Sequence, residues 1–267
     1  MPELPEVESV RRQLEPELTG RRVDRTWIDP HPGVPRQFHR VDRSAGRRIH
    51  DVGRRGKFLI CPMDGGVELI MHLGMTGSLR FDVDDPYVRA RLTLDDGRDL
   101  VYRDVRRFGR IAVVDRGDYA ALPMLAALGP EPLSDEFDPA RFAADLASTK
   151  AQIKPYLLTQ KPVAGVGNIY ADEALWLARI HPASRRVGPK RAAALHAAIR
   201  EVLLASVERE GTTFRDYRMV DGASGSNARF LVAYGREGKP CPRCSTPMRR
   251  IVLAGRGTTY CPRCQRH

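Results

Sequence analysis

The chain has 267 residues, and its 44 lysines and arginines outnumber its 33 aspartates and glutamates, which gives a formal net charge of +11. Hydrophobic residues make up 42% of it, yet no apolar run approaches the roughly 20 residues of a membrane-spanning helix. The acidic first residues also exclude a signal peptide, so we expect a cytosolic protein. The basic excess favours a polyanionic partner, most often nucleic acid. The alternative explanation is a GC-rich genome, which prefers arginine codons.

The first predicted element is an amphipathic helix. Apolar residues recur at spacings of three and four, at Val7, Val10, Leu14 and Leu18. Removal of Met1 would leave Pro2 with a free secondary amine at the helix start, where the positive end of the helix favours the unprotonated form. Such an amine can attack a carbon and form an imine, and Glu3 and Glu6 could move protons or orient the reacting group. The alternative is an acidic first turn that only complements the helix dipole.

Short strands are predicted next, at residues 23–28, 48–52, 57–63, 67–72, 78–83, 89–94, 99–103 and 109–114. Regular turn signals between them indicate an antiparallel sandwich or barrel. A proline-rich loop covers residues 29–35. Lys57 begins an apolar strand, where it is either a solvated strand start or an ammonium group placed beside the amine or a phosphate.

Two glycine-bearing turns between the strands have a functional interpretation. In His72-Leu73-Gly74-Met75-Thr76-Gly77, Met75 either fills a gap in the core or wedges into a base stack. In Asp104-Val105-Arg106-Arg107-Phe108-Gly109, Phe108 is either a core residue of a β-turn or an aromatic ring that stacks on a base beside Arg106.

Helical patterns follow at residues 120–128, 138–146, 150–160, 168–179 and 190–210, with a boundary near residues 128–132. The segment Val163-Ala164-Gly165-Val166-Gly167-Asn168 leads two glycines directly into a helix. Its backbone N–H groups could hold a phosphate, with Asn168 as N-cap; the alternative is simple capping of a turn. A polar, glycine-bearing loop is expected to be mobile over residues 216–229.

The C-terminal cysteines give the strongest local signal. Two CxxC pairs with sixteen residues between them fit one tetrahedral, structural Zn²⁺. Its ligands would be Cys241, Cys244, Cys261 and Cys264. The residues between the pairs can form a hairpin with Arg256 at its tip, where Arg256 either contacts a phosphate or is simply solvated. Cys61 stands alone in a strand-like run and is expected to be a small buried hydrophobic residue.

Taken together, these motifs resemble one family, the bacterial formamidopyrimidine-DNA glycosylases, also called 8-oxoguanine DNA glycosylases, of the helix–two-turn–helix superfamily. The resemblance runs from Pro2 to Gln265. It implies an α+β fold: an N-terminal helix with an antiparallel β-sandwich, a helical helix–two-turn–helix domain, and a C-terminal β-hairpin zinc finger. The corresponding domains are residues 1–130, 131–228 and 229–267.

The resemblance also implies an activity: excision of oxidised purines from duplex DNA by a monomer, followed by β- and δ-elimination at the abasic site. By position, the catalytic residues are Pro2 as nucleophile, Glu3, Glu6 and Lys57. Met75, Arg106 and Phe108 correspond to residues that fill the void left by the flipped base. The residues that correspond to phosphate contacts are His72, Lys154, Asn168 and Arg256.

One segment departs from the family pattern. The lesion-recognition loop often carries an aromatic residue after its second glycine, whereas this chain has Gly225-Ser226-Asn227. Two alternatives therefore stay open: a preference for oxidised pyrimidines, as in endonuclease VIII, and a lesion-binding or architectural zinc-finger protein without catalysis. The second gives no reason for a free Pro2 beside Glu3.

Overall fold

The computed structural model describes residues 2–31, 37–214 and 217–267. It divides into two compact units, one of residues 1–126 with 209–228, the other of residues 127–208 with 229–267. Residues 209–228 thus pack with the N-terminal sheets and not with the helices that they follow. The three-domain division at residues 130 and 228 stays a prediction. No helix in the described parts of the chain is both long and apolar enough to span a bilayer.

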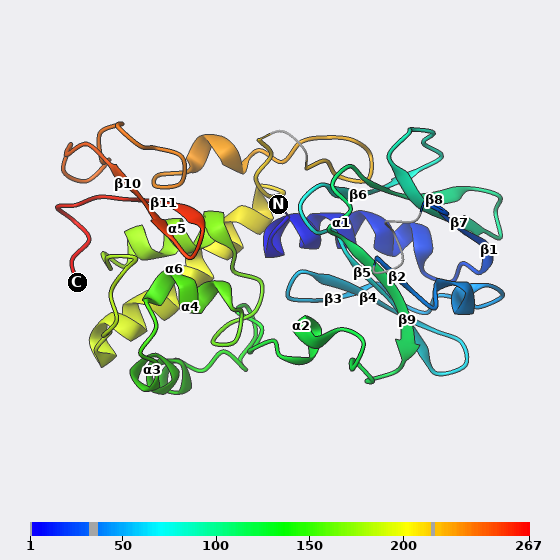
Figure 1. The fold of residues 1–267 in the computed structure, drawn as a ribbon, viewed down its shortest axis with the longest axis horizontal. Coiled ribbons are helices and arrows are strands. Elements are labelled where there is room, and N and C mark those ends of the chain that lie inside the picture. The colour runs from blue at the N-terminus through cyan, green and yellow to red at the C-terminus, as the bar shows by residue number, and fades with distance from the viewer. Residues whose placement is uncertain (1, 32–36, 215–216) are drawn as a thin grey trace. The chain divides into compact units, whose positions relative to one another are not determined.

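The first unit pairs one long helix with two β-sheets (Figure 1). One sheet has the order β1-β7-β8-β6 and the other β2-β9-β5-β4-β3. All neighbours are antiparallel except the short pair β2 and β9. The elements are α1 (Leu4–Leu18), β1 (Val23–Ile28), β2 (Phe38–His39), the 3₁₀ helix η1 (Val41–Ser44), β3 (Gly53–Arg55), β4 (Phe58–Met63), β5 (Val67–His72), β6 (Gly77–Phe81), β7 (Val88–Leu94), β8 (Asp99–Asp104), β9 (Arg110–Asp115) and α2 (Pro123–Ala126).

The predicted apolar face of α1 is confirmed. Val7, Val10, Leu14 and Leu18 are each at most 1% exposed and join one core with residues of both sheets. Cys61 lies in the same core and is fully buried, as predicted. Burial of such side chains stabilises the unit by about 1.5–3 kcal/mol each.

Two predicted elements differ from the structure, and a third is only partly described. Residues 48–52 form only isolated bridges, at Arg48 and Ile49, and the regular pairing starts with β3. The helix predicted at 120–128 is the short α2, which starts at Pro123, because proline is tolerated only in the first turn of a helix. The proline-rich loop at 29–35 lies partly outside the described residues.

The second unit is built on helices and a hairpin (Figure 1). Among its helices, α6 packs against α5 and α3, and β11 of the hairpin packs on α5. The elements are α3 (Pro139–Ser148), α4 (Ile153–Leu158), α5 (Asn168–Leu177), α6 (Pro189–Glu208), the 3₁₀ helix η2 (Asn227–Phe230) at the boundary between the units, β10 (Arg249–Leu253) and β11 (Arg256–Tyr260).

Candidate functional site

The start of α1 places Pro2 next to a fixed carboxylate. Pro2 directly precedes Glu3, the N-cap, and Glu3 and Glu6 form a capping box. One oxygen of Glu6 accepts the Glu3 N–H at 2.7 Å, and the other accepts the Thr212 N–H at 2.6 Å. Both carboxylates are 1% exposed. The acidic first turn therefore has a structural role as well as the predicted chemical one, because Glu6 fixes the backbone beside Pro2.

The segment after residue 209 is docked on α1. Tyr217 donates its hydroxyl to the Glu6 carbonyl at 3.1 Å, and Gln13 accepts the Val220 N–H at 2.7 Å. Tyr217 and Val220 are buried in the N-terminal core. This part of the loop that was expected to be mobile is thus attached to the helix that begins beside Pro2. A Cβ on Gly211 would lie 2.7 Å from a Glu6 oxygen, so only glycine lets the chain pass so close to that carboxylate.

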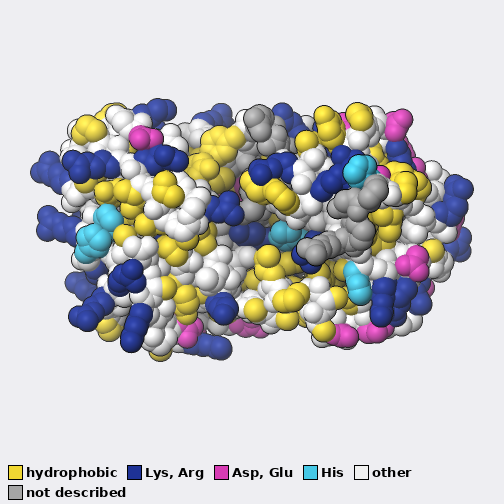
Figure 2. Space-filling model, viewed as in Figure 1, with side chains coloured by type: hydrophobic (Ala, Val, Ile, Leu, Met, Phe, Trp, Pro, Cys, Tyr) yellow, Lys and Arg dark blue, Asp and Glu magenta, His cyan; other side chains and the backbone are white. Residues whose placement is uncertain are grey.

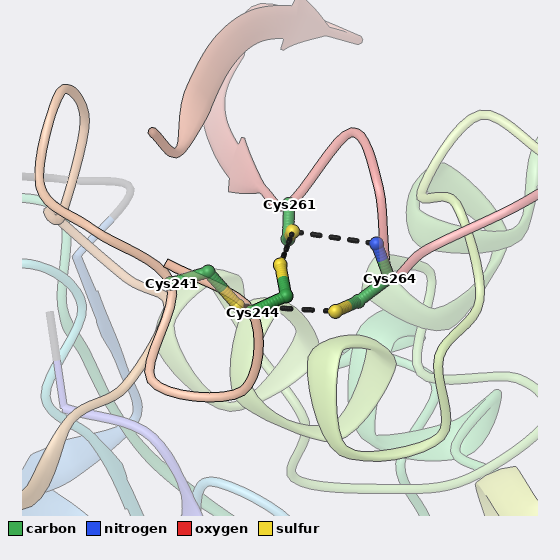
Figure 3. A group of neighbouring side chains, drawn as sticks. All are labelled: Cys241, Cys244, Cys261 and Cys264. Atoms are coloured by element: carbon green, nitrogen blue, oxygen red, sulfur yellow. Dashed lines mark hydrogen bonds between the residues drawn. The ribbon is translucent and has the colours of Figure 1, made fainter. Parts of the chain in front are cut away.

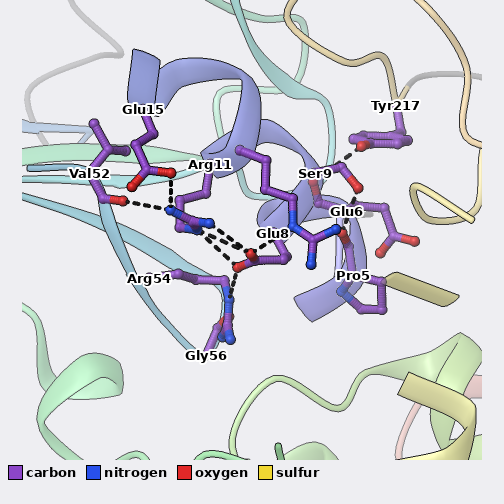
Figure 4. A network of polar contacts seen from close by, with 11 residues as sticks. Pro5, Glu6, Glu8, Ser9, Arg11, Glu15, Val52, Arg54, Gly56 and Tyr217 are labelled. Carbon is purple, nitrogen blue, oxygen red and sulfur yellow. Dashed lines mark hydrogen bonds and ion pairs between the residues drawn. The ribbon is translucent and has the colours of Figure 1, made fainter. Parts of the chain in front are cut away.

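A polar network ties the same helix to β3 (Figure 4). Glu8 accepts from Arg54 at 3.0 Å and pairs with Arg11 at 3.1 Å. Arg11 also donates to Glu15 and to the Val52 carbonyl. These side-chain ionic contacts are only partly buried, so each contributes modestly. Together they fix the rotation of the helix against the strand that leads into Lys57.

Lys57 lies in the turn just before β4, close to His72, the last residue of the adjacent strand β5. Phe58, next to Lys57, pairs with His72, and their rings are 4.6 Å apart. Burial, and then the positive charge of Lys57, lowers the pKa of His72 to about 4. The neutral imidazole accepts the Gly74 N–H at Nδ1, which leaves Nε2 as the protonated nitrogen. His72 can therefore donate a hydrogen bond to a phosphate without carrying charge.

Asp104 organises the two turns that carry the predicted void-filling residues. It is fully buried and accepts from the Thr76 hydroxyl at 2.6 Å, the Gly109 N–H at 2.9 Å and the Arg106 N–H at 3.3 Å. The Gln37 amide and the Tyr102 hydroxyl complete its partners. The carboxylate thereby links the turn after β5 to the turn after β8.

The two turns touch through their backbones. Gly74 has φ +60°, and a Cβ there would lie 2.5 Å from the Gly109 nitrogen, so glycine is required. Met75 is half-buried beside it. Phe108 is 54% exposed, with the Arg106 guanidinium 4.8 Å from its ring. The core position considered for Phe108 is wrong, and the structure presents it to solvent together with Arg106.

In the second unit, Lys154 is a buried ion-pair partner. Its ammonium group is fully buried, 2.7 Å from Asp172 of α5. It also donates to the Gly257 carbonyl and the Thr258 hydroxyl of the hairpin. Asp172 accepts the Thr259 N–H at 2.9 Å. The pair therefore connects α4, α5 and β11, and direct contact between Lys154 and a phosphate stays a prediction.

Asn168 is the first residue of α5 and not its N-cap, which is Gly167. Its amide donates to the Gly257 carbonyl at 3.2 Å, and its carbonyl oxygen is buried without a hydrogen-bond partner among the described residues. Gly167 has an extended backbone and no side chain, so no side-chain hydrogen bond caps this helix. The side chain of Asn168 is thus directed to the hairpin, from which Arg256 projects.

The hairpin is confirmed, but its turn is shifted. Leu253 pairs with Arg256, so the turn consists of Ala254 and Gly255, and Arg256 is the first residue of β11. Both turn residues have positive φ, 45° and 73°, which suits the twist of a two-residue hairpin. Arg256 remains exposed, as a phosphate contact requires.

The four cysteines converge at the base of this hairpin (Figure 3). Their sulfur atoms lie within 4.8 Å of one another, with 3.5 Å from Cys244 to Cys261 and 4.0 Å from Cys241 to Cys264. A tetrahedral Zn²⁺ with Zn–S bonds of about 2.3 Å needs sulfur atoms roughly 3.8 Å apart. The donors therefore fit zinc, and all four positions are filled by protein.

Sequence reasoning missed the residues that hold the site in place. Asp104 was visible inside its motif, but nothing there indicated that it binds both turns. Asp172 and Glu173 of α5 were also missed: Glu173 accepts the N–H groups of Val232, Ala233 and Tyr234. Two adjacent acids on an otherwise apolar helix were the available signal, because buried carboxylates require partners.

Comparison with known proteins covers nearly the whole chain. Residues 1–111 match the formamidopyrimidine-DNA glycosylase N-terminal domain, residues 128–218 the formamidopyrimidine-DNA glycosylase H2TH domain, and residues 238–266 a zinc finger found in FPG and IleRS. The last match includes all four cysteines, which hold one structural Zn²⁺.

The relatives match over their full length. The formamidopyrimidine-DNA glycosylase of Deinococcus radiodurans is 46% identical, with 99% of this chain and 97% of that protein covered. The crystal structure of the MutM (FPG) protein from Thermus thermophilus has a TM-score of 0.93 at 47% identity, with 99% and 98% covered. A complex of a Lactococcus lactis FPG mutant with Fapy-dG containing DNA has a TM-score of 0.90 at 35% identity, with both chains fully covered. This chain belongs to the formamidopyrimidine-DNA glycosylase family.

Proposed function

We propose that this protein is a bifunctional DNA glycosylase and abasic-site lyase that excises oxidised purines, 8-oxoguanine and formamidopyrimidines, from duplex DNA. The observation that carries the proposal is the start of α1, where Pro2 precedes a capping box whose Glu6 carboxylate is held by two backbone N–H groups. The relative bound to Fapy-dG containing DNA supports the substrate class. We place the protein in the bacterial cytosol as a monomer.

The proposed first step is attack on the sugar. After removal of Met1, the Pro2 nitrogen bonds to C1′, the bond from C1′ to the base breaks, and the departing base takes up a proton. The ring oxygen then leaves C1′ and is protonated, for which Glu3 is the proton donor. The Pro2 nitrogen loses its proton when the bond to C1′ forms, and because proline is a secondary amine the product is an iminium ion between Pro2 and C1′ of the open sugar. Two eliminations break the C3′–O and C5′–O bonds and cut the strand on both sides.

The remaining residues supply binding and position. Glu6 fixes the backbone of Glu3, and Lys57 places a positive charge near the reacting sugar and its phosphate. Met75, Arg106 and Phe108 occupy the space that the flipped base leaves, since such a base must leave the stack before it can be attacked. His72, Asn168 and Arg256 contact phosphates. Lys154, which the resemblance assigns to a phosphate, holds the hairpin from behind through Gly257 and Thr258, and the zinc keeps that hairpin folded.

A product profile tests the substrate class. Duplexes with 8-oxoguanine, a formamidopyrimidine, thymine glycol or an abasic site are incubated with the zinc-loaded protein, and the products are resolved. We expect base release and double elimination on the two purine lesions. Preferential cutting of thymine glycol would instead show the specificity of endonuclease VIII. Binding of every lesion without cutting, by protein that lacks Met1, would reject catalysis.

A further inference from the structure

A basic cavity lies against the zinc centre and shares Cys244 and Cys264 with it. It holds about 760 Å³, and its basic lining residues are Arg179, Arg191, Arg243, Arg263, Arg266 and His267. None of the residues that the family resemblance assigns to phosphate binding belongs to the lining. Figure 2 shows Lys and Arg side chains gathered over the region of the C-terminal segments.

One of these arginines is already engaged. Arg243 donates to the Trp176 and Leu177 carbonyls at 2.6 and 3.0 Å, and its guanidinium lies 3.8 Å from the centre of the Trp176 ring. It thereby neutralises the negative end of α5, which would otherwise repel an anion from this cavity. Arg243 forms the wall. The Arg191 guanidinium makes one backbone contact, to the Arg266 carbonyl, and it remains with Arg179, Arg263 and Arg266 to bind a ligand.

Hydrogen bonds hold the chain in place around Arg179, Arg191 and Arg266. The Arg266 carbonyl accepts from the Arg191 guanidinium at 2.6 Å and from the His181 N–H at 2.9 Å. The Arg266 N–H donates to the Arg179 carbonyl at 3.4 Å. Arg191 belongs to the first turn of α6, where the helix end carries positive partial charge. The cavity is therefore held by the fold, although its charged ends face solvent.

Charge compensation of the zinc does not account for the cluster. Four thiolates around Zn²⁺ carry a net charge of −2, and the five guanidinium groups carry +5, which leaves +3. A terminal carboxylate on His267 would lower this excess by one and leave it positive. Among the described residues, no aspartate or glutamate forms an ion pair with Arg179, Arg191, Arg263 or Arg266 or lines the cavity. Like charges this close are stabilised by an anion.

We propose that this cavity is a second phosphate site, which takes two adjacent phosphate groups, either of a nucleic-acid backbone or of a free polyphosphate. Guanidinium groups bind phosphate oxygens through paired N–H donors, and the volume lies in the range of ligand pockets. On a nucleic acid, the site would hold a strand by its backbone and so contribute affinity without sequence preference.

The test is pyrophosphate binding by the full-length, zinc-loaded protein, measured by isothermal titration calorimetry. We expect Arg179→Gln/Arg263→Gln to weaken binding at least tenfold. Arg22→Gln/Arg25→Gln, with Arg22 just before β1 and Arg25 on it, removes the same charge elsewhere and should change binding less than twofold. Zinc content is measured for each variant. If the first variant loses zinc, Arg179→Gln alone replaces it, with an expected loss of at least threefold.

A second arm distinguishes the sources of phosphate. On undamaged duplexes of increasing length, the dependence of log K on log salt is measured for the same variants. If the ligand is nucleic acid, the slope should be smaller by about 1.8 in the cavity variant than in wild type, because two phosphate contacts are lost. The difference should appear once the duplex is long enough to reach the cavity. An unchanged slope with lost pyrophosphate binding assigns the site to a free polyphosphate. Equal pyrophosphate binding by wild type and cavity variant, or equal losses in both double variants, would overturn the proposal, whether or not the protein excises bases.

Discussion

Replacing Asp104 with asparagine is expected to loosen both turns that carry the void-filling residues. One oxygen of Asp104 accepts from Thr76 and the other from Gly109 N–H and Gln37. An asparagine oxygen can keep the bond with Thr76, but its NH₂ group then faces the Gly109 N–H, donor against donor. Gln37 can turn its amide to compensate, because its own carbonyl oxygen has no partner among the described residues.

The cost therefore falls mainly on the Gly109 N–H. A buried donor without a partner costs about 1–3 kcal/mol, so we take about 2 kcal/mol for the loss in unfolding free energy. At about 2–4 °C per kcal/mol, Tm should fall by about 4–8 °C. If about 1.4 kcal/mol of this is also lost in the excision transition state, excision of 8-oxoguanine slows about tenfold.

Differential scanning calorimetry and single-turnover excision measure the two effects. The matched control is Asp99→Asn on the same strand, whose carboxylate accepts from the Thr93 hydroxyl and is half-buried; its Tm should change by less than 2 °C. Wild-type Tm and excision rate in Asp104→Asn would refute the view that this carboxylate holds the turns.

Four further predictions concern protonation, burial, metal binding and a phosphate contact. The pKa of His72 in the folded protein is lowered to about 4, so the unfolded chain binds more protons than the folded one between about pH 4 and 6.5. The free energy of unfolding should therefore fall by up to about 3 kcal/mol as the pH drops through that window. Urea titrations should show a smaller fall for His72→Asn than for wild type. Lys154→Met leaves Asp172 buried and unpaired, so the second unit should lose about 3–5 kcal/mol, with recovery in Lys154→Met/Asp172→Asn; a wild-type urea midpoint in the single variant would contradict the burial argument. Cys244→Ser should release zinc and weaken DNA binding while the circular dichroism of the N-terminal sheets persists. Arg256→Ala should lower the slope of log K against log salt for DNA binding by about 0.9. For Arg256→Ala, a loss of affinity that depends on DNA sequence would contradict a phosphate contact.

Local patterns predicted the parts of the fold that depend on neighbours in sequence. The spacing of Val7, Val10, Leu14 and Leu18 predicted the buried face of α1, because a helix presents every third or fourth residue to one side. The two CxxC pairs predicted four converging sulfur atoms, because each pair needs only a local turn. The exact boundaries of two elements depend on the backbone angles of single residues and were not predicted. They are the N-cap of α5 at Gly167 and the hairpin turn that begins at Ala254.

Long-range contacts were not readable from the sequence. Asp104 has partners at residues 37, 76, 102 and 109, which come together only through the sheet topology. The resemblance assigned Lys154 to a phosphate contact, but its partner Asp172 lies on another helix and both side chains are buried. Spacing says nothing about such burial, whereas the exposure of Arg256 follows from its place beside a hairpin turn.

The central claim is that the Pro2 amine forms a covalent iminium ion with the sugar of a damaged nucleotide. Borohydride trapping on duplex DNA with 8-oxoguanine, followed by peptide mapping of the adduct by mass spectrometry, tests it directly. We expect the adduct on the peptide that begins with Pro2, and none when Met1 is retained. An adduct on Lys57, or an equal yield from protein that retains Met1, would contradict the claim.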